Sequence, residues 1–345
     1  MSATAAPQTT AAFGTVVAPH MVVASTGDGI FAAPSVTLTA PLALHPFAHA
    51  LHYGSACFEG LKAHRGVDGQ VRLFRADRHA ARLSASAARL LLPDPGATMV
   101  HDAIVAAVRA NLDVVPEAPG SLYVRPVLLG VEPNIGAAAA PSAEATLFVV
   151  ASPVGDYFAG GARPLTLVVE TTLPRTTPQF GRVKAGANYV MALGITQQAR
   201  ARYGADQVLF APNGIVQETG AANLLLVSSQ RIVTPELDDG FLHGVTRDSL
   251  LTLARDRGMV VEERHVTVDD VVDWIEAGGE AALAGTAAVL AAVGTVTVDG
   301  REVRVRGGDG DGVFGPYTSA LREALVAVQH GRVDDRHEWT VEVKP

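Results

Sequence analysis

The sequence predicts an α+β fold in two domains. Strand-like runs and amphipathic helical patterns occur in both halves of the chain, and its 345 residues exceed what one core usually holds. The stretch from Ser152 to Pro164 is dense in Gly and Pro between two apolar runs, which is typical of a domain boundary. We therefore expect an N-terminal arm at 1–19, a small N-terminal domain at 20–152, a linker at 153–163 and a large C-terminal domain at 164–345.

Hydrophobic periodicity predicts the elements of each half. The first half should hold helices at 77–92 and 99–115, then buried strands at 122–129 and 146–151. Asp77 can cap the first helix, and its apolar face is expected to comprise Ala81, Leu83, Ala87 and Leu90. The second half should hold strands at 165–170, 207–211, 222–227, 259–263 and 280–284, and helices from Lys184 to about 203 and at 245–257, 269–277 and 318–328.

Composition indicates a globular protein with a small-molecule partner. The net charge of −8 argues against nucleic acid or an acidic membrane surface, because both attract basic proteins. No apolar run approaches the roughly 20 residues that span a bilayer. The first 19 residues have neither a basic start nor a continuous apolar core, so we expect no secretory signal and a cytoplasmic location.

Three short patterns point to no chemistry. Cys57 is the single cysteine, which excludes an internal disulfide, and its apolar neighbours predict a buried structural thiol. His45, His49 and His52 have metal-like spacing, but without nearby carboxylates or cysteines we expect structural histidines and no metal site. Residues 310–315 match G-x-G-x-x-G, yet the run before them alternates charge with valine, which predicts an exposed hairpin strand and no dinucleotide site.

Lys184 is the first candidate for chemistry. The chain has three lysines among 27 basic residues, and only a lysine can lose its proton, because an arginine guanidinium cannot be deprotonated in a protein. Small residues around Lys184 leave room for a ligand near the backbone, and desolvated amines form Schiff bases. A solvated surface lysine is the alternative.

Seven motifs in order carry a family resemblance. They are Leu51–Lys62 (LHYGSACFEGLK), Leu73–Asp77 (LFRAD), Leu122–Pro126 (LYVRP), Val183–Tyr189 (VKAGANY), Gln217–Leu224 (QETGAANL), Leu242–Arg247 (LHGVTR) and Gly285–Ala288 (GTAA). The series resembles that of the branched-chain amino acid aminotransferases, of the fold-type IV pyridoxal-phosphate class. This resemblance implies a smaller N-terminal α/β domain, a larger C-terminal pseudo-barrel domain and a homodimer in which a loop of each subunit completes the other's site.

The resemblance also implies how pyridoxal 5′-phosphate is bound. Lys184 would hold the cofactor covalently and, once displaced by substrate, act as the general acid–base at the substrate Cα. Glu218 would keep the pyridine nitrogen protonated, and Tyr189 would bond the phenolic oxygen; an exposed turn and a core tyrosine are the alternatives. The phosphate would be bound by Arg75 and the helix start at Val245 and Thr246, the ring would pack on Leu242, and Thr286 would lie near the phosphate and the substrate carboxylate.

The substrate residues follow in the same way. The pocket must accept an alkyl side chain in one half-reaction and a carboxylate in the other. Tyr53, Phe58 and Tyr157 would form its apolar wall; Phe58 as plain core is the alternative. Tyr123 and Arg125, with Lys62 nearby, would supply polar contacts for the acidic side chain or the α-carboxylate. Ala287 would offer a backbone N–H beside Thr286. A structural turn is the alternative for these last two residues.

We therefore expect transamination between leucine, isoleucine or valine and 2-oxoglutarate. Other readings keep the fold but use a different hydrophobic donor of specialised metabolism or a D-amino acid. A cofactor-binding protein without catalysis and a lyase that releases ammonia are the remaining alternatives.

The chain departs from the family pattern at several positions. Ala221 and Ala222 stand where relatives usually carry Thr-Met, and Leu225 replaces a large aromatic, so the pocket could be enlarged or less polar. Ala288 and Ala291 fill the places of two cysteines that form a redox switch in some relatives, so we expect no such regulation.

Overall fold

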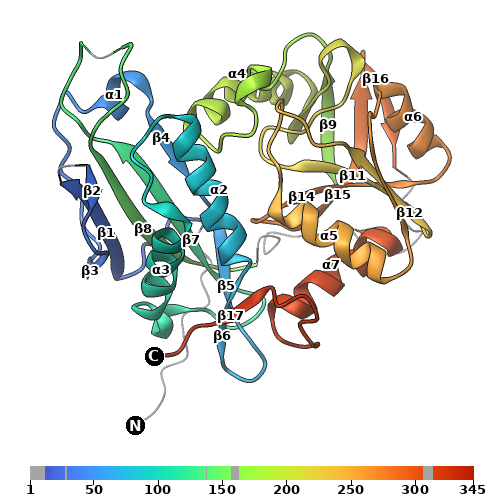
Figure 1. Cartoon of the computed structure of the whole chain (residues 1–345). Helices are drawn as coiled ribbons and strands as arrows, with labels where there is room; N and C mark the ends of the chain where they lie inside the picture. The colour runs from blue at the N-terminus through green and yellow to red at the C-terminus, as the bar shows by residue number, and fades with distance from the viewer. Residues whose placement is uncertain (1–11, 28, 137, 157–162, 306–313) are drawn as a thin grey trace. The chain divides into compact units, whose positions relative to one another are not determined.

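The protein is described by a computed structural model, which covers residues 12–345 except 28, 137, 157–162 and 306–313 (Figure 1). The chain forms two compact units. The first comprises Met1–Ala159, Val183–Gly186 and Ala327–Pro345, and the second comprises Gly160–Arg182 and Ala187–Val326. Within the described residues, no helix is long and apolar enough to cross a membrane.

The first unit is built on a nine-stranded sheet, counted over the described residues. Its main path runs β17 (Thr340–Glu342), β6 (Val71–Phe74), β5 (Leu61–Arg65), β7 (Ser121–Gly130), β8 (Ala145–Val154), β1 (His20–Gly27) and β2 (Ile30–Phe31), with β3 (Ser35–Leu38) on β1 and β4 (Ala56–Phe58) on β7. The helices are α1 (His49–Tyr53), α2 (Ala76–Arg89) and α3 (Gly96–Arg109), with a 3-10 turn at Leu112–Val114.

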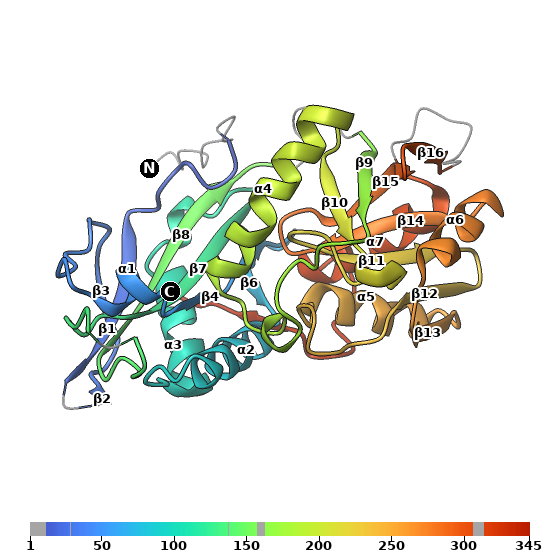
Figure 2. The same ribbon diagram turned by 90° about the horizontal axis from the view of Figure 1, so that it is seen from above.

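Helices α2 and α3 pack side by side on one face of this sheet (Figures 1 and 2). Leu83 of α2 and Ile104 of α3 join Leu61 and Leu122 of the strands in one buried core. Because side chains alternate along a strand, Lys62 and Tyr123 point to the opposite face, and they stand directly opposite each other in the β5–β7 ladder. The polar residues of the family motif are thereby kept away from the apolar core.

The second unit holds an eight-stranded sheet among its described residues. The order is β10 (Gln207–Phe210), β9 (Leu165–Glu170), β15 (Val289–Val298), β14 (Glu280–Gly285), β11 (Asn223–Val227), β12 (Arg231–Pro235) and β13 (Val260–Arg264), with β16 (Arg301–Arg304) on β15. Its helices are α4 (Gly186–Tyr203), α5 (Val245–Asp256), α6 (Val268–Glu276) and α7 (Pro316–Gln329), with 3-10 turns at Pro178–Phe180 and Pro212–Gly214.

Most predicted elements are present with small boundary shifts. Strand β8 runs on to Val154, through residues that we expected to begin the linker. Pro153 is tolerated there because β1 covers only Thr146–Val149, which leaves the later part of β8 paired on one side by β7. The alternating run after the Asp299–Gly300 turn forms β16, as predicted, and residues 306–313 lie outside the described residues.

Two expectations about capping and burial have different outcomes. The N-cap of α2 is Arg75, not Asp77, which lies inside the first turn; the helix starts earlier because Arg75 adopts a left-handed conformation that breaks the preceding strand. Cys57 is fully buried, as predicted, and burial together with the Glu59 carboxylate raises the pKa of its thiol to about 12.

The compact units differ from the expected division in two further segments. The C-terminal residues belong to the first unit because β17 pairs with β6. Residues Val183–Gly186 also belong to it, because the carbonyl of Lys184 accepts a hydrogen bond from the Phe58 N–H at 2.9 Å. Lys184 is therefore held by the first unit, although the helix that follows it belongs to the second.

Candidate active site

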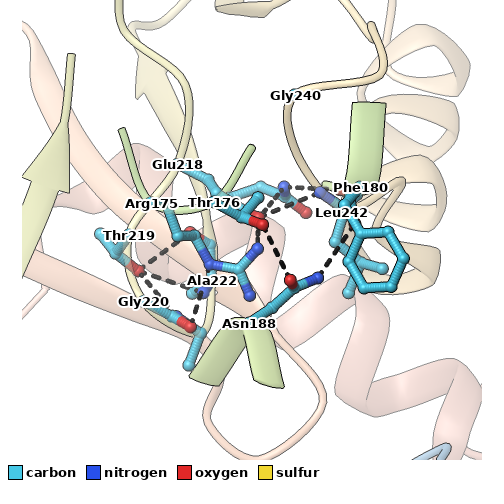
Figure 3. A network of polar contacts seen from close by, with 12 residues as sticks. Arg175, Thr176, Phe180, Asn188, Glu218, Thr219, Gly220, Ala222, Gly240 and Leu242 are labelled. Carbon is cyan, nitrogen blue, oxygen red and sulfur yellow. Dashed lines mark hydrogen bonds and ion pairs between the residues drawn. The ribbon is translucent and has the colours of Figure 1, made fainter. Parts of the chain in front are cut away.

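Glu218 is the centre of a buried polar network in the second unit (Figure 3). Its side chain is 2% exposed, and a buried carboxylate is costly unless charged and polar partners satisfy it. Oε1 accepts a hydrogen bond from the Leu242 N–H at 3.0 Å, and Oε2 accepts one from Asn223 Nδ2 at 3.1 Å. The carboxylate is thereby fixed in one orientation.

Arg175 supplies the countercharge for Glu218. Its Nη1 lies 2.7 Å from Glu218 Oε1 in an ion pair with both side chains 2% exposed, although the two groups are not aligned as a hydrogen bond. Nε donates to the Gly220 carbonyl at 3.3 Å, and the guanidinium lies 5.5 Å from the centroid of the Tyr189 ring. Arg175 therefore joins two predicted cofactor residues, Glu218 and Tyr189.

Asn188 ties the loop that carries Arg175 to the start of α4. Asn188 is 1% exposed; it accepts a hydrogen bond from Thr176 Oγ1 at 2.8 Å and donates to the Phe180 carbonyl at 3.0 Å (Figure 3). Tyr189 is the next residue on this helix. Sequence reasoning missed Arg175 and Asn188 as site residues, because nothing in their local pattern indicates which distant group they contact.

The N-terminus of α5 is suited to an anion. Its N-cap, Gly244, provides no side chain, so no side-chain cap occupies the first N–H groups of the helix. A Cβ at Gly244 would lie 2.0 Å from Asn223 Oδ1, so the glycine is required by close packing. Asn223 also donates to the Leu242 carbonyl at 3.0 Å, and one amide thus links Leu242, Glu218 and the helix start at Val245 and Thr246.

Thr286 and Ala287 lie in the tight turn between β14 and β15, where Gly285 pairs with Val289. Val289 closes the turn with a φ of 64°, which is a strained conformation for a β-branched residue. The adjacent strand β11 brings Asn223 opposite Ala284. Strand β14, which leads into this turn, is therefore paired with the strand that carries Asn223.

In the first unit, Phe58 contacts both Lys184 and Arg125. The Lys184 amine lies 5.0 Å from the centroid of the Phe58 ring, and the Arg125 guanidinium lies 4.5 Å from it. Arg125 Nη2 donates to the Tyr123 hydroxyl at 2.6 Å. Phe58 therefore forms an apolar surface between two cations.

Lys62 and Gly60 complete this polar face. Lys62 is 8% exposed and pairs across the ladder with Tyr123. A Cβ at Gly60 would lie 2.1 Å from the Tyr123 hydroxyl, so only glycine allows the tyrosine to lie over the backbone there. The face combines two cations and a hydroxyl, which suits a carboxylate.

Arg75 is held in a strained conformation at the start of α2. It has a φ of 53°, is 7% exposed, and its guanidinium lies 5.0 Å from the centroid of the Trp339 ring. Its N–H donates to the Trp339 carbonyl at 2.7 Å. Packing in the C-terminal segment thus fixes where this arginine points.

The predicted residues fall into two groups, one in each unit. Lys184, Arg75, Phe58, Lys62, Tyr123 and Arg125 lie in the first, and Tyr189, Glu218, Leu242, Val245, Thr246, Thr286 and Ala287 lie in the second. Tyr53, at the end of α1, is 38% exposed and its hydroxyl donates to the Ile135 carbonyl. Tyr157 lies outside the described residues.

The histidines of the metal-like pattern have other partners. His49 bonds Ser55 Oγ through Nδ1 at 2.8 Å, and the Nε2 of His52 bonds the Pro46 carbonyl at 2.8 Å. Within the described part of the chain, no three His, Cys, Asp or Glu side chains gather into a group that could hold a metal ion.

Replacing Gly244 with alanine should destabilise the protein. The new Cβ would force the Asn223 amide away from Glu218, with an expected cost of about 1–3 kcal/mol. Thermal unfolding of Gly244→Ala would measure this. Gly194→Ala is the control, since a Cβ on this helical glycine meets nothing within 4 Å; equal melting temperatures for the two variants would contradict the packing argument.

Comparison with known proteins identifies the family. Residues 56–293 match the model of the class IV aminotransferases. A probable branched-chain-amino-acid aminotransferase of Streptomyces coelicolor is 40% identical over 308 residues, covering 87% of this chain and 83% of that protein.

Two solved structures of a branched-chain amino acid aminotransferase from T.th. have the same fold. The one with pyridoxamine 5′-phosphate has a TM-score of 0.77 at 27% identity, and the one complexed with N-(5′-phosphopyridoxyl)-L-glutamate has a TM-score of 0.74 at 27% identity. Each alignment covers 96% of this chain and 100% of the other. The predicted fold class is confirmed, and the chain belongs to the class IV aminotransferases, among the fold-type IV branched-chain enzymes.

Proposed function

We propose that this chain transfers an amino group between a branched-chain L-amino acid and 2-oxoglutarate, with pyridoxal 5′-phosphate bound at Lys184. The observation that carries the proposal is the buried Glu218 carboxylate with its Arg175 countercharge and two hydrogen-bond donors. A carboxylate held in this way can keep a pyridine nitrogen protonated. The reaction agrees with the names of the relatives reported above.

The residues fit the cofactor. When bound, pyridoxal phosphate supplies an electron sink for the bonds at the substrate Cα. Glu218 would hold the proton at the ring nitrogen, and Tyr189 would donate to the phenolic oxygen. The uncapped start of α5 at Val245 and Thr246, together with Arg75, would bind the phosphate, and Leu242 and Thr286 would line the ring.

Lys184 is assigned the proton transfer. Its amine can take the proton from the substrate Cα in one half-reaction and return a proton to Cα in the other, because a neutral amine is a base and an ammonium is an acid. The Phe58 ring lies beside it, with its centroid 5.0 Å from the amine.

The face opposite α2 and α3 would bind the substrate. Phe58 presents an apolar surface for an alkyl side chain, and Arg125, Tyr123 and Lys62 present donors for the carboxylate of glutamate. Tyr53, Tyr157 and the backbone N–H of Ala287 are assigned to the remaining substrate contacts. One pocket would thus accept both partners of the exchange.

A different hydrophobic donor is the second candidate. Ala221, in the place of a family threonine, is exposed, and the Gly285 Cβ position lies 3.6 Å from its carbonyl oxygen, beside the Thr286 turn. The smaller side chain would leave room there for a larger substrate. Leu225 is fully buried in β11, so that departure belongs to the core.

The chain would work as a cytoplasmic homodimer. Phe47 and Leu51, beside Tyr53, are 47% and 59% exposed. Apolar side chains gathered around α1 suit a subunit contact, through which Tyr53 would serve the other subunit's site. Light scattering of the purified protein would test this, and a monomer would refute it.

Lys184→Ala should remove turnover. Loss of the proton-transferring amine is expected to lower the rate by at least about a thousandfold. Glutamate formation from L-leucine and 2-oxoglutarate measures the rate, with Lys344→Ala, at an exposed position, as the control. Turnover that survives in Lys184→Ala would remove this lysine from its role.

The visible absorption spectrum of the unsubstituted protein tests the reaction itself. The yellow band of the lysine-bound cofactor should disappear when L-leucine is added and return when 2-oxoglutarate is added. A yellow protein that ignores leucine but responds to another amino acid would support the second candidate, and release of ammonia would indicate a lyase. A colourless protein that cannot take up pyridoxal phosphate would contradict both.

Arg125→Met should affect the acidic substrate more than leucine. Loss of a charged donor is expected to raise the KM for 2-oxoglutarate about 10- to 100-fold, corresponding to about 1.5–3 kcal/mol, and to change the KM for leucine much less. Steady-state kinetics with both substrates would measure this, with exposed Arg78→Met as the control. Equal effects on the two substrates would contradict the assignment.

A further inference from the structure

We propose that Glu59, His79, Arg82 and Ser86 are positioning residues, which fix Lys184 against Phe58 and so set the proton affinity of its bond to the cofactor. The proposal rests on the proposed function, in which Lys184 binds pyridoxal phosphate. It assigns a role to four buried or half-buried polar groups that the substrate and cofactor contacts leave unused.

The cluster is centred on Glu59, which is fully buried. Arg82 holds both carboxylate oxygens, with Nε 2.6 Å from Oε1 and Nη2 2.9 Å from Oε2. His79 Nδ1 lies 2.6 Å from Oε2, and the Gly60 N–H donates to the same oxygen at 3.2 Å. A carboxylate that is held at both oxygens in this way is fixed in one orientation.

One face of α2 carries the partners of Glu59 and also a partner of Lys184. His79, Arg82 and Ser86 follow each other at helical spacing. Ser86 is 2% exposed, and its hydroxyl accepts a hydrogen bond from the Lys184 N–H at 3.2 Å. The helix therefore holds two segments that are far apart in the chain, at 58–60 and 183–186.

These two segments are also bonded to each other. The Phe58 N–H donates to the Lys184 carbonyl at 2.9 Å, and the Lys184 amine lies over the Phe58 ring. The Glu59 N–H donates to the Pro126 carbonyl at 2.8 Å, next to Arg125. A shift of Glu59 would therefore move Phe58 and, with it, both of these Lys184 contacts.

The charges of the cluster balance. Burial alone would raise the pKa of Glu59, yet Arg82 and His79 hold it well below its usual range. Burial lowers the pKa of His79 in spite of Glu59, and Arg82 and Lys184 lower it further. Glu59 and Arg82 form an ion pair, and Cys57, whose pKa the Glu59 carboxylate helps to raise, stays a neutral thiol.

The Lys184 charge is one of the causes that lower the pKa of His79, so the lysine and the cluster lie within electrostatic reach of each other. Glu59→Gln would remove the negative charge that balances Arg82, and the added positive charge of the cluster would disfavour a proton on the Lys184 nitrogen. A buried ion pair adds little stability by itself, since apolar groups of the same size often replace it without loss. We therefore assign these charged groups a role in positioning Lys184 and not in stability.

The test is a pH titration of the visible absorption of the holoenzyme. Glu59→Gln should lower the pKa of the Lys184 linkage by about one pH unit, a tenfold loss of proton affinity. Ser86→Ala should reduce kcat for leucine about threefold to tenfold with KM nearly unchanged, since about 1 kcal/mol of hydrogen bonding is removed from the lysine and not from the substrate. Glu59→Asp keeps the charge and should restore most of the titration.

Ser84→Ala is the matched control, because Ser84 lies on the same helix but bonds Asp94, and it should titrate like the parent. If Glu59→Gln does not fold, the kcat and KM of Ser86→Ala for leucine test the positioning role. Yellow, folded Glu59→Gln and Ser86→Ala variants that match the parent would overturn the positioning role. A parent that takes up no pyridoxal phosphate would instead refute the proposed function.

Discussion

The burial of Glu218 is the constraint on which the second unit's half of the site depends. A carboxylate taken out of water needs a cation and hydrogen-bond donors, and here they come from Arg175, Asn223 and the Leu242 backbone. Each partner also holds something else. Arg175 reaches the Tyr189 ring, and Asn223 packs against Gly244 at the start of α5. Satisfying one charge thus positions both the Tyr189 ring and the start of α5, which are the groups proposed to meet the cofactor ring and its phosphate.

The first unit meets a similar need with Glu59. There the two side-chain partners are on a single helix, so the carboxylate ties a strand end to α2, which also bonds the segment of Lys184. The two buried carboxylates have different consequences. Glu218 would face the cofactor itself, whereas Glu59 is enclosed and acts through the position of Phe58.

Strand alternation separates stability from chemistry in the first unit. Leu61 and Leu122 point into the helix-covered core, and their neighbours Lys62 and Tyr123 point to the other face. Gly60 admits the tyrosine hydroxyl, which in turn accepts from Arg125. A short stretch of two strands therefore supplies both the apolar core and the proposed carboxylate contacts.

The sequence by itself determined the family, through its ordered motifs, and it predicted most helices and about half of the strands of the described residues, because periodicity and motif spacing are local properties. It gave no ranges for strands β1 to β6, β12, β15 and β17, and it assigned Lys184 to the C-terminal domain, whereas this segment groups with the first compact unit. Only the tertiary structure decided that Arg175 meets Glu218, that Arg82 binds Glu59 and that Ser86 bonds the lysine segment. The partner of a buried charge is chosen by folded proximity, and no residue pattern near Arg175 or Glu59 records it.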